Sequence, residues 1–432
     1  MTERRIKVDA LARVEGEGAL YVKLNGDVLE ACEFRIFEPP RFFEALLRGR
    51  DAHEAPDITS RICGICPIAY IMSASQAVEQ ALGLTVSPEI HALRRLIYCG
   101  EWIQSHVLHA AMLHAPDFLG LPDVMEIAKA EPDLVRKALR LKKIGNTLME
   151  TVGGRAVHPV NTRVGGFFRA PDRAALEALL PELDWGIQAA REIALAFARF
   201  DFPEDAGDYH FVSLIHPEVY PIAEGRIGSS RGLDIPAEAF NDHFAEHHVA
   251  RSNALQGRMR DGTAYLVGPL ARYANNFARL SPTAQDTARA AGLAEVEQNP
   301  FKSILIRMVE VQYACEEAAR LIRGYCPPDP AFVEAPPRAG VGHAVTEAPR
   351  GICYHRYEVD AEGRILAAQI VPPTAQNQPQ MEADLARVVR ANLRADDDAL
   401  RHRCEQTIRN YDPCISCATH FIKLTVERCE AA

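Results

Sequence analysis

Two cysteine pairs at opposite ends of the chain are the strongest constraint on its fold. The stretch RICGIC places Cys63 and Cys66 in the N-terminal part, and DPCISC places Cys414 and Cys417 in the C-terminal part. A CxxC turn puts two sulfurs on one side of the backbone, so both sulfurs of a pair can reach a single metal ion. If all four thiolates hold one ion, the two ends of this 432-residue chain must meet.

The spacing alone leaves the identity of the metal open. Four soft thiolate ligands suit zinc, an iron–sulfur cluster or a thiophilic transition metal. Zinc sites of this type usually take both pairs from one short segment, which they stabilise, and the cysteines of iron–sulfur clusters also lie closer together. A redox dithiol explains one pair but not a matched second pair. A structural zinc site and a catalytic metal centre therefore both fit the spacing.

The composition is that of a globular protein with a substantial core. Hydrophobic residues make up 48% of the chain and charged residues 25%, which is ordinary for such proteins. The net charge of -10 and the lack of a basic run argue against a nucleic-acid partner. No apolar stretch approaches the roughly 20 residues that span a bilayer, and residues 1–16 lack the apolar core of a secretory signal. We therefore expect a cytoplasmic protein without a membrane span.

Hydrophobic periodicity predicts a predominantly helical α+β fold. Strand-like alternation surrounds the hairpin signal Asn25-Gly26 within residues 5–37, and a second β unit is expected at 351–373. Helical periodicity is expected at 71–83, 87–115, 121–150, 173–200, 236–255, 279–291, 300–325 and 379–410, whereas prolines make 326–337 irregular. Because no flexible linker interrupts this pattern, it predicts one large domain with the N-terminal and C-terminal β pieces around a core of long helices.

Seven short stretches, in order along nearly the whole chain, resemble the large, catalytic subunit of nickel–iron hydrogenases. The chain is most similar to the cytoplasmic branch that couples hydrogen to NAD(P), which includes the sulfhydrogenases. The resemblance implies the large-subunit fold of that family and the reversible oxidation of hydrogen to protons and electrons. The stretches are RVEG (13–16), RFFEALLRGRD (41–51), RICGICPIAY (61–70), GGRAVHP (153–159), EAPRG (347–351), VPPTAQN (371–377) and DPCISCATH (412–420).

The resemblance implies that the four cysteines hold a nickel–iron centre. Cys63 and Cys414 would be terminal nickel ligands, Cys66 and Cys417 would bridge nickel and iron, and the iron would carry carbon monoxide and cyanide ligands. Thiolates stabilise oxidised nickel and can accept a proton, which suits heterolytic cleavage of hydrogen. Zinc or copper would compete for such a site, so its loading has to be controlled by delivery through nickel-insertion chaperones.

The resemblance also assigns roles to five residues around these cysteines. Arg350 corresponds to an arginine above the metals, and Asp412 would lie beside it as its partner. Glu15 corresponds to a carboxylate that relays protons away from the metal. Glu44 and His420 match the ligands of magnesium, or another divalent ion, near the C-terminus. Without the resemblance, Arg350 fits an ordinary salt bridge, Asp412 a turn and Glu15 a surface strand.

Two positions depart from the pattern of the family. Tyr70 stands where many members have a histidine that hydrogen-bonds a cysteine sulfur. A tyrosine hydroxyl can donate such a bond but cannot become cationic near neutral pH. Ser105 stands where other branches have an aspartate near the arginine. The nearby His106, His109 and His114 are interpreted as packing residues or as supports for the site, not as metal ligands.

Electron transfer and the residues after His420 both imply partner proteins. The chain has no further cysteine cluster for an iron–sulfur relay and no GxGxxG nucleotide fingerprint. The resemblance therefore implies a small subunit with iron–sulfur clusters and a diaphorase-type subunit with flavin, which reduces NAD(P), with sulfur or polysulfide as a further acceptor. In the family a maturation protease cuts after the histidine of DPCxxCxxH, so the mature catalytic domain would be 1–420 and the extension 421–432 would be removed.

Two other functions stay open at this stage. One is a hydrogen sensor with the same centre and little turnover, although sensor members generally lack a removable tail. The other is a structural or interaction subunit that binds metal through its four cysteines without turnover.

Overall fold

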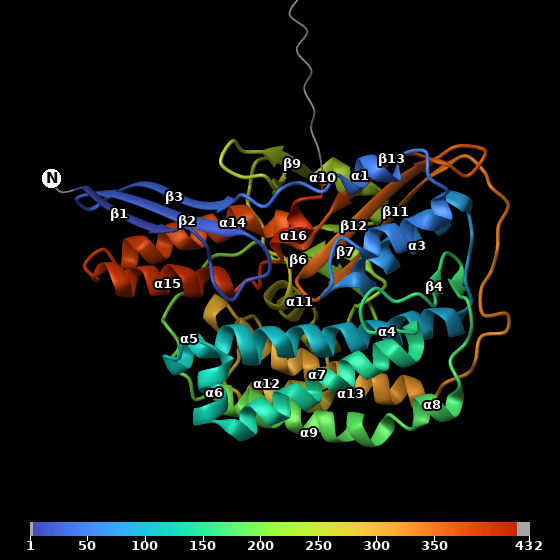
Figure 1. The fold of residues 1–432 in the computed structure, drawn as a ribbon, viewed down its shortest axis with the longest axis horizontal. Coiled ribbons are helices and arrows are strands. Elements are labelled where there is room, and N and C mark those ends of the chain that lie inside the picture. Colours follow the sequence, from blue (N-terminus) through green and yellow to red (C-terminus); the bar gives the residue numbers. More distant parts are fainter. Residues whose placement is uncertain (1–2, 421–432) are drawn as a thin grey trace, which may run out of the picture.

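Four long helices form the lower layer of the molecule in Figure 1, a computed structural model that describes residues 3–420. Helix α4 packs on α7, and α13 packs on both α4 and α9. The close approach of α4 and α7 depends on glycine, because a Cβ at Gly145 would lie 2.5 Å from the carbonyl oxygen of Gly100. The helices are α4 (Pro88–Val107), α7 (Pro132–Gly153), α9 (Leu180–Phe197) and α13 (Ser303–Arg323).

Two separate three-stranded antiparallel sheets lie above the helices. The N-terminal sheet has the order β1–β2–β3 and turns at Gly26, whose φ of 60° is in the left-handed region. In the C-terminal sheet, β11, β12 and β13 are neighbours in that order, and α3 (Pro67–Leu82) packs on β11 and β12. The strands are β1 (Glu3–Val8), β2 (Gly18–Asn25), β3 (Val28–Ile36), β11 (Gly340–Ala348), β12 (Gly351–Val359) and β13 (Ile365–Val371).

The C-terminal segment returns to the N-terminal part of the chain. Helix α14 (Pro373–Ala391) packs on β3, α15 (Asp397–Arg409) packs on α14 and β1, and the single turn α16 (Ile415–Ala418) packs on α14. Backbone hydrogen bonds then join distant segments: the N–H of Ile415 donates to the carbonyl of Glu15. In Figure 1, α16 therefore lies between the N-terminal sheet and the β11–β13 sheet.

Shorter elements complete the fold. A π-helical segment continues α4, and small sheets with the orders β6–β7–β8, β9–β10 and β4–β5 join the helices. These elements are α1 (Phe43–Leu47), α2 (Ala55–Ser60), η2 (Leu108–His114), α5 (Ala115–Leu119), α6 (Val124–Ala130), β4 (Thr162–Arg163), β5 (Gly166–Phe167), α8 (Arg173–Glu177), β6 (Val212–Ile215), β7 (Arg226–Ser229), β8 (Asp234–Ile235), α10 (Phe240–His243), β9 (Phe244–His248), β10 (Leu255–Met259), α11 (Pro269–Asn276) and α12 (Pro282–Ala290).

One predicted helix is wrong. Within residues 236–255, the structure has a 3-10 turn (Ala237–Ala239) and the short α10, after which the chain turns into β9 and runs toward β10. Phe240 and Phe244 have the spacing of one helical face, but their rings stack on each other at 4.7 Å, and Phe240 also stacks on Tyr354 at 4.1 Å. Tertiary packing of these rings therefore produced an apolar spacing that resembles helical periodicity.

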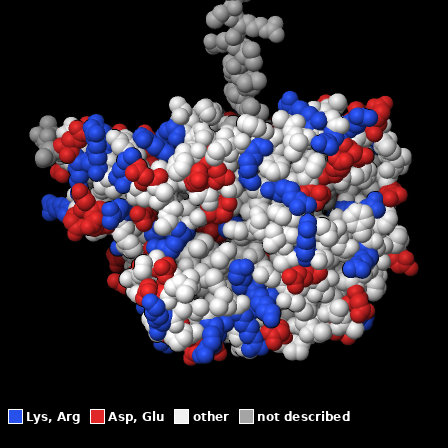
Figure 2. All heavy atoms as spheres, in the orientation of Figure 1, with Lys and Arg blue, Asp and Glu red and all other residues white. Residues whose placement is uncertain are grey.

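The surface carries side chains of both charge signs. Acidic and basic side chains are interspersed over most of the face shown in Figure 2. Within residues 3–420, no helix combines the length and the apolar character that crossing a membrane requires.

Candidate metal centre

The four paired cysteines form one buried cluster, in which an N-terminal and a C-terminal segment of the chain meet. Their sulfur atoms all lie within 4.8 Å of one another. Across the two pairs, the sulfurs of Cys63 and Cys414 are 3.5 Å apart and those of Cys66 and Cys417 are 3.6 Å apart. All four are free thiols and buried. Because burial penalises several thiolates at one place, a bound cation is needed for all four to ionise, and the cluster therefore fits a thiophilic metal.

The first pair lies at the start of helix α3. The N–H groups of Ile65 and Cys66 donate to the sulfur of Cys63 at 3.3 and 3.2 Å, which fixes the turn. One residue into α3, the carboxylate of Glu101 accepts the N–H of Ile68 at 2.6 Å and that of Ala69 at 3.2 Å. Burial raises the pKa of Glu101 well above its ordinary value. Glu101 was not predicted from the sequence, because one glutamate within an apolar helix carries no specific signal.

The second pair is held by residues from distant segments. Cys414 donates its N–H to Thr374 Oγ1 at 3.0 Å and forms an isolated parallel bridge with Glu15. The Glu15 carboxylate lies 3.0 Å from the sulfur of Cys414 and accepts the N–H of Ser416 at 3.1 Å. The predicted proton relay residue is therefore in hydrogen-bond contact with a predicted metal ligand.

Arg350 lies beside the cluster and is buried. Its Nε donates to the carbonyl of Asp412 at 2.7 Å, and its terminal nitrogens reach Asp412 Oδ1 at 3.0 Å and Ser105 Oγ at 3.4 Å. Burial alone would lower the pKa of Arg350, but the charges of Asp412 and Cys414 raise it well above its ordinary value. The guanidinium therefore stays cationic next to the thiols, and Ser105 lies at the position that the resemblance indicated.

The aromatic and histidine residues near the cluster are buried. Tyr70 is 1% exposed, and its hydroxyl has no hydrogen-bond partner among residues 3–420. His106 Nε2 lies 2.9 Å from Glu310 Oε2, and burial lowers the pKa of His106 to about 4. His109 Nε2 lies 2.8 Å from the carbonyl oxygen of Arg409. The rings of His109 and His114 lie 5.1 Å apart, an arrangement typical of packing residues.

A second candidate cation site joins α1, β13 and the residue at position 420. Glu44 Oε1 accepts the N–H of Ile370 at 2.7 Å, and His420 Nε2 lies 2.6 Å from the carbonyl oxygen of Ile370 and 4.0 Å from Glu44 Oε1. Burial raises the pKa of Glu44 to about 7, and burial together with the charge of Glu44 raises that of Glu246 to about 8. Two carboxyls that resist ionisation together suit a divalent ion. Glu246 was not predicted as a site residue, because it lies in the wrongly predicted helix.

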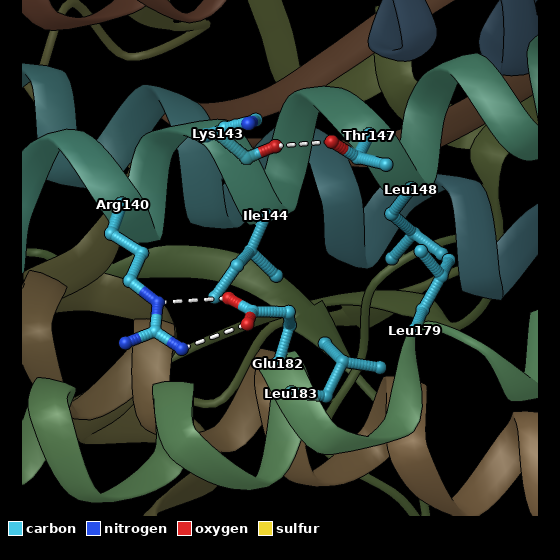
Figure 3. A pocket seen from close by; sticks show the side chains of 8 residues that line it. All are labelled: Arg140, Lys143, Ile144, Thr147, Leu148, Leu179, Glu182 and Leu183. Atoms are coloured by element: carbon cyan, nitrogen blue, oxygen red, sulfur yellow. Dashed lines mark hydrogen bonds and ion pairs between the residues drawn. The ribbon is translucent and has the colours of Figure 1, made fainter.

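A surface cavity of about 470 Å³ between α7 and the start of α9 lies apart from these sites (Figure 3). Its floor is apolar, with Ile144, Leu148 and Leu183, and at its rim Arg140 binds both oxygens of Glu182 at 2.9 and 2.8 Å. The cavity contains none of the predicted site residues.

The two CxxC turns bring four free sulfurs together in the interior, with a buried arginine beside them. This arrangement is that of a thiolate-ligated metalloprotein. Within that class, the chain belongs to the nickel-dependent hydrogenase family, whose model matches residues 41–169 and 258–420. The fold and the family predicted from the sequence are thereby confirmed.

Curated relatives and a solved structure cover nearly the whole chain. The chain is 33% identical to the sulfhydrogenase 1 subunit alpha of Pyrococcus furiosus, over 97% of this chain and 98% of that protein. It is 27% identical to the NAD-reducing hydrogenase HoxS subunit beta of Cupriavidus necator, over 97% and 95% respectively. The crystal structure of an NAD+-reducing [NiFe]-hydrogenase in the H2-reduced state matches with a TM-score of 0.88 and 25% identity, over 96% of this chain and 99% of that chain.

Proposed function

We propose that this chain is the large, catalytic subunit of a nickel–iron hydrogenase that reversibly oxidises hydrogen to protons and electrons. The observation that carries this proposal is the convergence of four buried sulfurs within 4.8 Å of one another in a chain of the nickel-dependent hydrogenase family. Family membership favours nickel over the zinc site that the spacing alone left open.

Each cysteine has a proposed place at the centre. Cys63 and Cys414 would bind nickel, and Cys66 and Cys417 would bridge nickel to an iron that carries carbon monoxide and cyanide. When bound, this centre supplies redox-active metals at which hydrogen is cleaved heterolytically. The four sulfurs would hold it in the buried interior of the chain.

Two further groups of this chain handle charge. The thiol of Cys414 donates toward Glu15 Oε2 over 3.0 Å, so a proton that reaches this sulfur passes to the carboxylate and away from the metals. Arg350 keeps a fixed positive charge beside the thiols through its bonds to Asp412. We therefore assign Glu15 as the proton acceptor and Arg350, with Asp412, as the group that stabilises negative charge during cleavage.

The end of the mature chain would contribute to a second ion. Glu44, His420 and the carbonyl of Ile370 would hold magnesium or another divalent ion. The extension 421–432 lies outside the described residues, and its removal after His420 by a maturation protease stays a prediction, as does the single catalytic domain 1–420. His420 itself is 2% exposed.

Electrons released at the buried centre have to pass to another protein. Gly64, between the first two cysteines, is exposed, whereas both cysteines are buried. We propose that a small subunit with iron–sulfur clusters receives electrons near this turn. A flavin-containing diaphorase-type subunit would then exchange them with NAD(P), as the names of the relatives suggest, with sulfur or polysulfide as a second acceptor. Nickel-insertion chaperones would load the site, and the cytoplasm is the expected location.

Metal analysis and activity of the purified complex test this proposal together. We expect nickel and iron in the chain, infrared bands of metal-bound carbon monoxide and cyanide, and hydrogen-dependent reduction of a viologen dye and of NAD(P). Zinc without nickel would refute the hydrogenase and favour the structural subunit. Nickel with both types of band but without significant dye reduction would favour the hydrogen sensor.

A further inference from the structure

Arg350 occupies the tip of a tight turn. Strands β11 and β12 pair up to Ala348 and Gly351, so only Pro349 and Arg350 form the connection. Gly351 has a φ of 133°, a conformation that favours glycine. The head of the Arg350 side chain is held by Asp412. Its position beside the cysteines also depends on what fixes the backbone of this two-residue turn.

We propose that Arg272 is the positioning residue for Arg350, because it binds the backbone of the turn and fixes its place relative to the four cysteines. This inference rests on the proposed function, in which Arg350 acts at the metal centre. Arg272 comes from α11, an element that supplies none of the predicted site residues.

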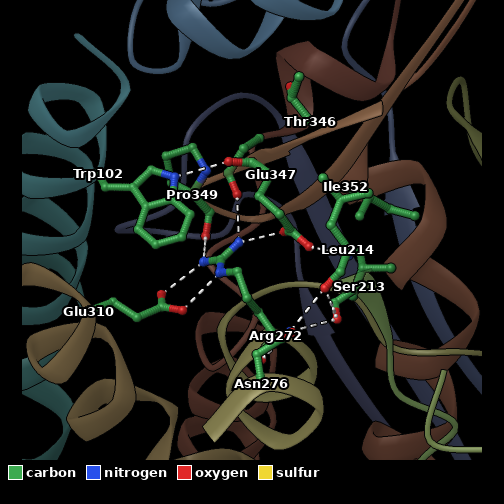
Figure 4. A network of polar contacts seen from close by, with 12 residues as sticks. Trp102, Ser213, Leu214, Arg272, Asn276, Glu310, Thr346, Glu347, Pro349 and Ile352 are labelled. Atoms are coloured by element: carbon green, nitrogen blue, oxygen red, sulfur yellow. Dashed lines mark hydrogen bonds and ion pairs between the residues drawn. The ribbon is translucent and has the colours of Figure 1, made fainter. Parts of the chain in front are cut away.

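All five N–H donors of Arg272 are used (Figure 4). Two of them bind Glu310, from Nε and one terminal nitrogen, each at 2.8 Å. The other three bind the segment that carries Arg350. They reach Glu347 Oε2 at 2.7 Å, the carbonyl of Ala348 at 3.0 Å and the carbonyl of Pro349 at 3.3 Å. A guanidinium alone offers five donors in a fixed planar geometry, so the contact specifies arginine.

The acceptors of Arg272 are themselves anchored to other elements. Glu310, on α13, also accepts the hydroxyl of Tyr220 at 2.7 Å, and Glu347 also accepts the N–H of Leu214 at 2.7 Å. The guanidinium lies 4.1 Å from the ring centre of Trp102, whose indole N–H donates to the carbonyl of Glu347 at 2.9 Å. The turn is therefore connected through Arg272 to α4, α11 and α13, and not only to its own strands.

The backbone of Gly268 lies close to the other side of the turn, where a side chain would not fit. A Cβ at Gly268, directly before α11, would lie 2.6 Å from the carbonyl oxygen of Arg350, and Gly268 has a φ of 107°. Arg272 thus binds the turn on one side, and the missing side chain of Gly268 allows its close packing on the other. A displacement of about 1 Å at a reacting centre costs roughly 100-fold in rate, so loss of the Arg272 bonds or a side chain at Gly268 is expected to reduce turnover.

A double-mutant cycle tests whether Arg272 acts through Arg350. Arg272→Lys, Arg350→Lys and the double variant are prepared in the complete complex, and nickel content, turnover per nickel and the infrared bands of the iron-bound ligands are measured. We expect Arg272→Lys to load nickel normally, to shift the bands and to lower turnover per nickel about 10- to 100-fold. The double variant should stay within about 2-fold of Arg350→Lys, because coupled residues are not additive.

A matched control separates positioning from general stabilisation. Arg94 is also buried and binds both oxygens of Glu79, but among the described contacts it makes none with the turn. Arg94→Lys should keep the wild-type bands and turnover per nickel. Gly268→Ala, which displaces the turn without changing any charge, should reproduce the band shift of Arg272→Lys and replaces that variant if it does not fold.

Four results would overturn the inference. The first is a double variant whose loss of turnover is the product of the losses in the two single variants, and the second is an Arg272→Lys enzyme with wild-type bands and turnover. The third is an Arg272→Lys enzyme that loses nickel but keeps its turnover per nickel, and the fourth is an Arg94→Lys enzyme with the same changes as Arg272→Lys. A wild-type complex without nickel and without the infrared bands would instead refute the proposed function itself.

Discussion

The two CxxC pairs contribute the same side chains but are held by different kinds of contact. Cys66 directly precedes the long helix α3, whose first N–H groups are bound by Glu101, only 33 and 32 residues further along the chain. Cys414 is bound by Thr374, 40 residues away, and by Glu15, 399 residues away. The N-terminal pair therefore belongs to a pair of neighbouring helices, and the C-terminal pair depends on both ends of the chain.

This difference suggests an order of assembly. Contacts between neighbouring helices form readily, whereas contacts between distant segments carry a larger entropic cost of closing the loop. The half-site around Cys63 and Cys66 can thus form with the helical core, and the half-site around Cys414 and Cys417 closes last. In such an order the metal can enter before the C-terminal segment is fixed.

The largest expected effect should be the same for both pairs. Cys66→Ser and Cys417→Ser each remove a proposed bridging sulfur, so each should lose nickel and hydrogen oxidation by more than the roughly 100-fold that loss of a supporting residue costs. Elemental analysis and dye reduction measure both losses. Cys326→Ser, at an exposed cysteine outside the cluster, is the control and should behave as wild type. Retained nickel in either cluster variant would contradict a single four-cysteine centre.

The next effect concerns the N-terminal half-site alone. Glu101→Ala leaves the N–H groups of Ile68 and Ala69 buried without an acceptor, and each such group costs about 1–3 kcal/mol. We expect the free energy of unfolding to fall by about 2–6 kcal/mol, measured by urea denaturation of the metal-free chain. Glu101→Gln keeps one carbonyl oxygen and should lose about half as much. A loss from Glu101→Ala below that of Glu101→Gln would show that the carboxylate does not hold the helix.

A pH dependence is expected at the second candidate cation site, which the C-terminal segment completes with His420. The raised pKa values of Glu44, about 7, and Glu246, about 8, mean that the folded chain holds these protons more tightly than the unfolded chain. Without a divalent ion, the stability that they contribute is complete below about pH 4.3 and is lost as the pH rises through 7 and 8. Glu44 alone accounts for about 3 kcal/mol.

Thermal unfolding at pH 5 and pH 8, with and without Mg²⁺, measures this effect. Millimolar Mg²⁺ should remove most of the loss at pH 8, because the ion stabilises the ionised carboxylates. Compared with wild type, Glu246→Gln should lose the part of the pH dependence that belongs to Glu246, whereas the contribution of other groups, such as the buried His106, stays the same. An unchanged pH dependence in the metal-free variant would show that Glu246 has no raised pKa.

Much of the site was predictable because its metal-binding residues form local sequence motifs. The CxxC turns indicated metal binding from the sequence, and the long helices around Gly100 and Gly145 followed from strong periodicity over many residues. The resemblance added Glu15, Glu44 and Arg350, which the structure places next to the cysteines or to His420.

The supporting residues were not predictable, because their roles arise only from tertiary contacts. In the sequence, Glu101 and Arg272 resemble ordinary charged residues of helices. Only the folded structure shows that both bind backbone groups of the site. Glu246 was assigned to a helix because the spacing of Phe240 and Phe244 imitates helical periodicity. Periodicity reports which side chains are apolar but does not report which distant ring they contact.

The smallest expected effect tests most directly whether the two half-sites are held independently of each other. Thr374→Val removes the oxygen that accepts the N–H of Cys414, which should cost about 2 kcal/mol. The amide of Cys414 should then exchange with solvent roughly 30-fold faster in the metal-free chain, measured by hydrogen exchange. Thr374→Ser retains the acceptor and should exchange as wild type.

The amides of Ile68 and Ala69 decide what this result means. If the C-terminal half-site opens without the helical core, their exchange should stay at the wild-type rate in Thr374→Val, because Glu101 still binds them. An equal acceleration at Ile68, Ala69 and Cys414 would mean that both half-sites open as one cooperative unit. In that case the C-terminal segment could not close separately, and the proposed order of assembly would be wrong.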